Sequence, residues 1–331
     1  MLRRIYSMCL ALVVPGGVVA QAQSPALSEP DRIRIAEAFR LGKSIGSELG
    51  PGATGIPFAI LLVTPDREFL IAHPRPSTDF TAVGYDSLLG TTVHTRPRQY
   101  GVGLMASFPA VGGMSTIVVG QPEQTKKSST FWVLTVLHER FHQIQTSQNG
   151  YYDGVAKLDL ANGDQSGQWM LQYPFPYDSA RVVEPFHQYR DALRRALSPS
   201  EDAEKVMRDV LAARATLRGA LSPAEWRYLE FQLWQEGISR YTELRVARAA
   251  ADQTPLPAFA QLPDFISYAS AADSLRKNIE RELATLNLAG WKRVAFYPTG
   301  AAEGLLLDRV NPSWRSRYFT ERFALEPFYR K

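Results

Sequence analysis

Two hydrophobic periodicities divide the sequence near residue 127, and this division leaves few fold classes open. Before it, apolar runs such as 56–64 and 68–73 are separated by turns rich in Gly and Pro, which is typical of strands. After it, apolar residues recur at helical spacing around 130–148, 178–197, 201–219, 223–250, 269–288 and 299–310. A mixed sheet followed by a set of helices predicts an α+β fold.

We therefore expect two portions after the N-terminus. Residues 23–127 are predicted to form a first helix, within Ser28–Leu49, and a mixed or antiparallel sheet whose strands line a substrate cleft. Residues 128–331 are predicted to form a mostly helical portion that carries the reactive side chains.

The N-terminal residues 1–22 have the pattern of a secretory signal peptide. Arg3 and Arg4 precede an apolar run that ends in small residues at Ala20 and Ala22. A membrane anchor is the alternative, but the run is interrupted by Pro15-Gly16-Gly17 and is too short to span a bilayer comfortably. We expect cleavage after Ala22 and a secreted or periplasmic protein with no stable membrane anchor.

The charged residues and the cysteine content exclude several classes of function. Lys and Arg number 37 and Asp and Glu number 33, with no basic block, so nucleic acid is not expected as a partner. The single cysteine, Cys9, excludes a disulfide scaffold and a cysteine-rich metal site. A metal ion would therefore be held by histidines and carboxylates.

The sequence His138-Glu139-Arg140-Phe141-His142 is an H-E-x-x-H motif. It lies in a stretch that is apolar on nearly every side and that Ser128, Ser129 or Thr130 could cap, so we expect a buried helix. Two histidines four residues apart lie on one helix face and can bind one Zn²⁺ ion, with Glu139 beside them as general base. The alternative is a pair of hydrogen-bonded core histidines with Glu139 in a salt bridge.

A catalytic zinc site needs a third protein ligand, and Glu236 is the first candidate. The metzincin pattern is excluded because Gln148 stands where its third histidine would be. Glu236 lies in a second helical stretch that is apolar on most sides, where a lone carboxylate is costly without a partner. Glu184 and His187 are the alternative ligands.

Residues near Glu236 suggest further roles. Gly237 would let another helix approach closely, and Glu243 returns to the same helix face, where it could accept the free ring N–H of a zinc-bound histidine. Arg240 could hold Glu243 in place. The alternative is that Glu236, Arg240 and Glu243 form only a ladder of ion pairs on a helix surface.

These residues resemble the gluzincins, the thermolysin-like zinc peptidases, which use two motif histidines and a downstream glutamate. The resemblance covers His138, Glu139, His142 and the segment around Glu236, although Glu236 follows His142 by 94 residues, a longer gap than in familiar members. The segment 112–116 is a weaker echo of a substrate-binding strand in the aminopeptidase branch, with Ser115 in place of its amine-binding glutamate.

The resemblance and the motif together predict a zinc metallopeptidase that acts on a peptide or protein substrate. Glu139 is expected to take a proton from the attacking water. Tyr241 and Tyr297 are the candidates for stabilising the oxyanion, followed by His187. The alternative from another class is a peptide- or envelope-binding scaffold with a structural or lost metal site.

Overall fold

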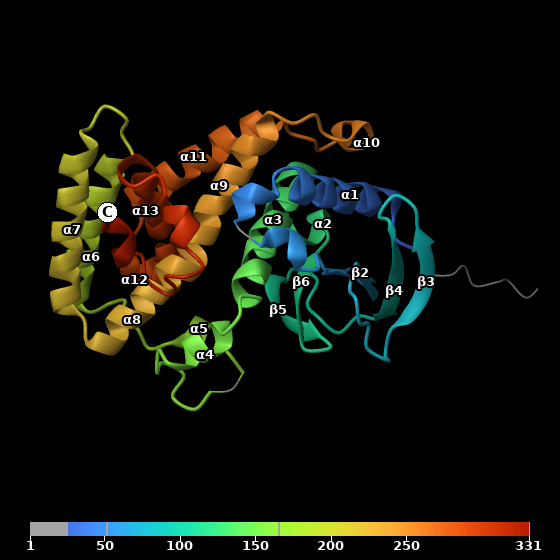
Figure 1. The fold of residues 1–331 in the computed structure, drawn as a ribbon, viewed down its shortest axis with the longest axis horizontal. Coiled ribbons are helices and arrows are strands. Elements are labelled where there is room, and N and C mark those ends of the chain that lie inside the picture. Colours follow the sequence, from blue (N-terminus) through green and yellow to red (C-terminus); the bar gives the residue numbers. More distant parts are fainter. Residues whose placement is uncertain (1–25, 51, 165, 331) are drawn as a thin grey trace, which may run out of the picture.

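The computed structural model describes residues 26–330 except Pro51 and Gln165 (Figure 1). The predicted signal peptide lies outside these residues. No helix in the described part is both long and apolar enough to cross a membrane.

The six strands of the described residues form one mixed sheet, as the sequence predicts. The strands are β1 (Ile60–Val63), β2 (Arg67–Ile71), β3 (Thr81–Asp86), β4 (Thr91–Pro97), β5 (Met105–Val111) and β6 (Met114–Gly120). Their order across the sheet is β3-β4-β2-β1-β6-β5. Only the β1–β6 pair is parallel within this sheet, and the other neighbours are antiparallel.

The sheet is buried on both faces in its central strands. On β1, Ile60 and Leu62 join the main core with the helices, whereas Leu61 and Val63 join a smaller cluster on the other face. This alternation follows from the two-residue period of a strand. The main-core face is covered by α1 (Glu29–Ser44) and α3 (Ser129–Thr146), which pack against each other. Strand β5 forms one edge of the sheet.

The rest of the described chain is helical, apart from its connecting segments. The longer helices are α6 (Ala180–Ala196), α7 (Ala203–Ala220), α8 (Pro223–Gln232), α9 (Ile238–Ala251), α11 (Tyr268–Thr285) and α13 (Phe296–Val310). Short helices are α2 (Pro122–Thr125), α4 (Tyr151–Ala156), α5 (Trp169–Gln172), α10 (Pro257–Ala260) and α12 (Leu288–Trp291). Single turns are η1 (Gly46–Leu49), η2 (Ala53–Gly55), η3 (Leu233–Gly237), η4 (Lys292–Ala295), η5 (Trp314–Arg317) and η6 (Glu326–Tyr329).

Helix α3 joins the two portions of the molecule. It contacts β5 and β6 on the sheet side and α9 on the helical side, and Figure 1 shows it between them. The expected single helix over 223–250 is instead α8 and α9 joined by η3, which is a turn of π-helix. The α+β prediction is therefore confirmed, and the division of the chain at residue 127 stays a prediction.

Candidate metal centre

Helix α3 buries the H-E-x-x-H motif. The helix begins after Ser128, whose hydroxyl accepts a hydrogen bond from the Phe131 backbone N–H. The side chains of the motif remain almost inaccessible, with His138 9% exposed, Glu139 6% and His142 7%. Three polar residues in a helix that is otherwise buried among apolar side chains need partners, because unpaired polar groups are costly in such surroundings.

The two histidines and Glu236 converge on one point. Nε2 of His142 lies 3.2 Å from Nε2 of His138 and 3.3 Å from Oε2 of Glu236. The ligand atoms of all three residues lie within 4.8 Å of one another, which makes them a possible metal-binding group in the described part of the chain. Ligands bound tetrahedrally at about 2.0–2.1 Å from Zn²⁺ are separated by about 3.3 Å. The donor types and these two separations fit a zinc ion.

The backbone around Glu236 departs from an ordinary α-helix. Glu236 lies in the π-helical turn η3, between α8 and α9, and such single π turns occur often at functional sites. Gly237 lets α13 approach this turn, since a Cβ at Gly237 would lie 2.4 Å from the Cα of Gly300. The close helix approach expected at Gly237 is therefore present.

Gln145 orients the ring of His142. The amide nitrogen of Gln145 donates to the Tyr318 hydroxyl at 2.7 Å and to the Gln235 carbonyl at 3.1 Å. Its oxygen consequently faces Nδ1 of His142, at 2.7 Å. The same Nδ1 also lies 3.1 Å from the side-chain nitrogen of Gln235 and 3.3 Å from the Ser239 hydroxyl. In the tautomer that carries its proton on Nδ1, this nitrogen donates to Gln145, and the lone pair of Nε2 is directed at the point where the three residues converge.

Glu243 lies beside His138, as expected. Its Oε2 is 3.7 Å from Nδ1 of His138 and accepts a hydrogen bond of 2.8 Å from Arg240. Burial alone would raise the pKa of Glu243, but the charges of Arg240 and His138 lower it to about 2. Arg240 thus holds the ionised carboxylate of Glu243 against the ring of His138. Glu236 pairs with other residues, so it does not form an ion-pair ladder with Arg240 and Glu243.

The second oxygen of Glu236 has its own partner. Nη1 of Arg293, in η4, donates to Oε1 of Glu236 at 3.2 Å and to the Tyr297 hydroxyl at 3.0 Å. Burial opposes ionisation of Glu236, but His142 and Arg293 lower its pKa to about 2. The carboxylate is therefore ionised and fixed by one oxygen, which leaves Oε2 directed toward the histidines.

Glu139 lies in different surroundings. Its Oε2 is buried and has no hydrogen-bond partner among the described residues. Burial raises the pKa of this carboxyl, although both histidines of the motif act in the opposite direction. A buried carboxylate oxygen without a partner, next to the converging ligands, is placed to interact with a molecule that enters the site.

Three of the other candidates lie elsewhere. The Tyr241 hydroxyl donates to both carboxylate oxygens of Asp308, at 2.7 and 2.8 Å, so the structure does not place it with the metal-binding group. Glu184 and His187 lie on α6, where Glu184 is exposed and accepts from Gln188. Neither is part of the group formed by the motif histidines. These positions do not support the roles suggested for Tyr241, Glu184 and His187.

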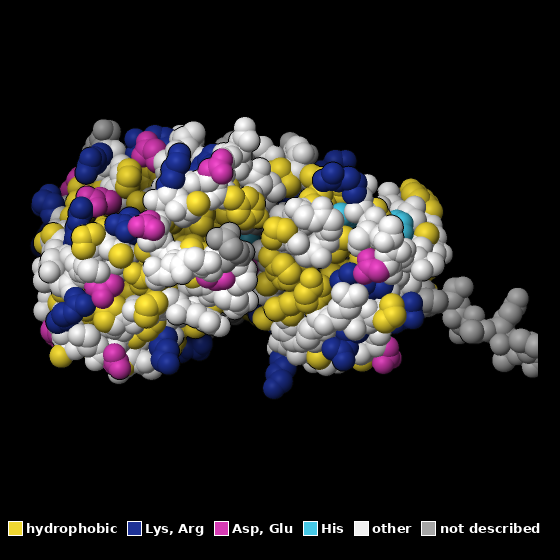
Figure 2. All heavy atoms as spheres, turned by 90° about the horizontal axis from the view of Figure 1, so that it is seen from below, with side chains coloured by type: hydrophobic (Ala, Val, Ile, Leu, Met, Phe, Trp, Pro, Cys, Tyr) yellow, Lys and Arg dark blue, Asp and Glu magenta, His cyan; other side chains and the backbone are white. Residues whose placement is uncertain are grey.

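The segment 112–116 lies next to the C-terminal end of α3. Gly112 and Gly113 form the turn between β5 and β6 with positive φ angles. The Ser115 carbonyl accepts from Gln143, and its hydroxyl accepts from Thr146. Figure 2 shows the surface hollowed between the sheet portion and the helical portion, with hydrophobic side chains along the sheet side. The substrate-lining role of this strand stays a prediction.

Sequence reasoning missed two residues that contact His142 and Glu236. Gln145 is three residues after His142 on the same helix, and that spacing is a signal that could have been used. Arg293 comes from a turn 57 residues after Glu236, and no local pattern singles it out. Comparison with known proteins found no matching family model, no similar curated protein and no similar solved structure.

Proposed function

We propose that this protein is a zinc-dependent metallohydrolase and that it cleaves peptide bonds. The observation that supports this most is the convergence of His138, His142 and Glu236 beside the unpaired carboxylate oxygen of Glu139. A purely structural zinc site is normally closed by four protein ligands. Three protein donors next to a carboxylate that nothing else uses fit a hydrolytic site better.

His138, His142 and Glu236 would hold the ion. When bound, Zn²⁺ would act as a Lewis acid and lower the pKa of a coordinated water to about 7. Glu139 would accept the proton of the attacking water on its free oxygen and pass it to the leaving nitrogen of the peptide. Gln145, Glu243 and Arg293 would keep the ligands oriented while the proton moves.

Tyr297 is the remaining candidate for stabilising the developing oxyanion. Its hydroxyl is held by Arg293, which also binds Glu236. A phenol this close to the third ligand can donate a hydrogen bond to a substrate carbonyl oxygen, and the adjacent guanidinium favours negative charge there. Tyr241 is not proposed for this role, because Asp308 already binds its hydroxyl.

The choice of peptide as substrate rests on the resemblance to gluzincins and on the N-terminal signal pattern. A secreted or periplasmic location follows from that pattern. The alternative, a scaffold that binds a peptide without cleaving it, would not require Glu139 to be free.

The substitution Glu139→Gln tests the proposed reaction. It removes the base and leaves the three ligands, so peptide hydrolysis should fall by about two to four orders of magnitude while the zinc content is unchanged. Activity would be followed with a library of fluorogenic peptides, and the zinc content by elemental analysis. The matched control is Glu280→Gln, an exposed glutamate on α11 that pairs only with Arg276 among the described residues, and it should leave hydrolysis unaffected.

Two outcomes would count against the proposal. Equal turnover by wild type and Glu139→Gln would show that Glu139 is not the base. A zinc-loaded wild type that binds peptides of the library but cleaves none would favour the scaffold.

A further inference from the structure

A cavity of about 330 Å³ is lined by residues of α3 and α9. It is enclosed by η1, α3, α9 and the segment 314–319, and none of the metal-binding residues lines it. Its walls include the buried Phe141, Ile238 and Trp314, whereas Ser47 and Ser316 at its rim are exposed. The cavity therefore has a buried floor and an accessible mouth.

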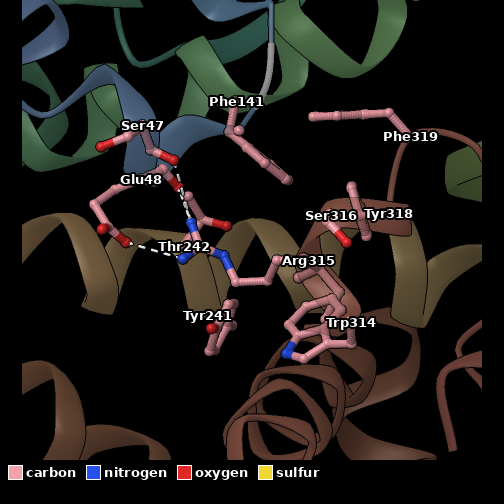
Figure 3. Close-up of a pocket in the computed structure, with 12 residues that line it drawn as sticks. Ser47, Glu48, Phe141, Tyr241, Thr242, Trp314, Arg315, Ser316, Tyr318 and Phe319 are labelled. Atoms are coloured by element: carbon pink, nitrogen blue, oxygen red, sulfur yellow. Dashed lines mark hydrogen bonds and ion pairs between the residues drawn. The ribbon is translucent and has the colours of Figure 1, made fainter. Parts of the chain in front are cut away.

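Five of the twelve residues that line this cavity are aromatic. Figure 3 shows Phe141 reaching in from α3 and Trp314 approaching from the opposite side, with Phe319 and Tyr318 beside them. Rings on two sides of a cavity favour a flat apolar or aromatic occupant, which can stack or make edge contacts with them. A volume of about 300 Å³ is at the lower end for small-molecule sites, so one or two rings would fill it.

One polar side chain lines this cavity without a partner. Thr242 is only 3% exposed as a residue, and its hydroxyl makes no hydrogen bond with any described residue. A hydroxyl in such a position can form one hydrogen bond with an occupant. The two serine hydroxyls at the rim differ from the hydroxyl of Thr242. Ser316 donates to the Ser313 carbonyl, and Ser47 is exposed to solvent.

The charges around the cavity are already compensated. Glu48 accepts from Arg245 at 2.8 Å and lies 3.2 Å from Nη1 of Arg315, and the dashed lines in Figure 3 mark the contacts between Arg315 and the η1 segment. An ionic ligand would have to break these pairs. The occupant is therefore expected to be neutral.

We propose that this cavity is a binding site for a neutral aromatic small molecule of one or two rings with one hydrogen-bonding group. The proposal does not depend on the hydrolytic function. The occupant would contact Tyr318, whose hydroxyl accepts from Gln145 and donates to the Trp234 carbonyl at 2.5 Å. The occupant would thus be connected to His142 through two hydrogen bonds, from Tyr318 to Gln145 and from Gln145 to His142. It would restrain Gln145, which orients the ring of His142.

Calorimetric titration with indole and phenol tests the site in the purified full-length protein. Both probes should bind with a stoichiometry of one. Thr242→Val keeps the shape of the side chain and removes the hydroxyl, so it should weaken binding of both probes by about two- to tenfold. Ile238→Phe adds a ring to the floor and should abolish binding. The matched control is Thr216→Val, an exposed threonine of α7 that should leave both affinities unchanged.

The proposal would be overturned by the absence of saturable binding of either probe to the wild type. It would also be overturned if Thr242→Val, checked for its native circular dichroism spectrum, bound both probes as tightly as the wild type. This second comparison remains decisive if Ile238→Phe does not fold.

Discussion

Glu139 and Glu236 are buried carboxylates beside the same histidines, but their surroundings give them opposite properties. Arg293 holds one oxygen of Glu236, and the pKa of this carboxyl is about 2 although burial opposes its ionisation. Glu139 has no such cation, and burial raises its pKa. Two titratable groups whose surroundings shift their pKa values in opposite directions suit different roles. In the proposed function, these roles are ligand for Glu236 and base for Glu139.

The guanidinium of Arg293 offers a test of this assignment. Arg293→Gln removes the charge that keeps Glu236 ionised and in place, so zinc affinity should fall by about 10- to 100-fold. Competition with a chromophoric chelator would measure it. Arg293→Lys keeps the positive charge but loses the second N–H group. Its zinc affinity should lie between those of the wild type and Arg293→Gln.

Arg194→Gln is the control, because Arg194 is exposed on α6. Zinc affinity unchanged in Arg293→Gln would mean that Arg293 does not position the third ligand.

At the scale of elements, the π-helical turn η3 and the contact of Gly237 with Gly300 position Glu236, the proposed third ligand. The turn carries Glu236 between two α-helical segments, and the absence of a Cβ at both glycines lets α13 lie against it. The same α13 follows directly on η4, which supplies Arg293. One close helix contact thus positions both Glu236 and its partner.

The substitution Gly237→Ala tests this contact. An added Cβ would meet backbone atoms of Gly300, which cannot move as a flexible side chain can. We expect a loss of about 1–3 kcal/mol in the free energy of unfolding, together with weaker zinc binding. Chemical denaturation and zinc titration measure these quantities.

Gly219→Ala is the matched helical control, because a Cβ at Gly219 has nothing within 4 Å. It should stabilise the protein by about 0.5–1 kcal/mol. Equal stabilities of Gly237→Ala and the wild type would rule out a tight helix contact at this position.

The sequence predicted the elements whose signal is local. The apolar pattern around 130–148 becomes α3, and the strand-like runs 56–64 and 68–73 become β1 and β2. The pattern over 223–250 could not reveal the π turn, because this stretch is apolar on most sides and a shift of its periodicity by one residue leaves no visible break. Arg293 could not be found either, because its contact with Glu236 exists only after α13 has packed against η3.

At the scale of the whole molecule, Glu48 ties the sheet portion to the helices. It belongs to η1 and pairs with Arg245 of α9 and with Arg315 of η5. Burial alone would raise the pKa of Glu48, but these two arginines hold it below its ordinary value of 4.5. A carboxylate with a lowered pKa stabilises the fold above its ordinary pKa and loses this effect as the pH falls through the folded-state pKa.

The pH dependence of stability tests this connection. Glu48→Gln should lower the free energy of unfolding by about 1 kcal/mol at pH 7. The difference from the wild type should shrink below pH 4.5, as the native carboxylate becomes protonated. Urea denaturation at a series of pH values measures it. A difference that stays constant down to pH 3 would show that the ion pairs are not its source.

The central claim is that His138, His142 and Glu236 hold one zinc ion. X-ray absorption spectroscopy of the zinc-loaded protein, combined with its measured zinc content, tests it most directly. The structure predicts one zinc per chain, with two imidazole nitrogens at about 2.0–2.1 Å and a carboxylate oxygen at about 2.0–2.2 Å. In Glu236→Ala, the carboxylate contribution should disappear and the zinc affinity should fall. Less than about one-tenth of an equivalent of zinc, or an unchanged zinc spectrum and affinity in Glu236→Ala, would contradict the account.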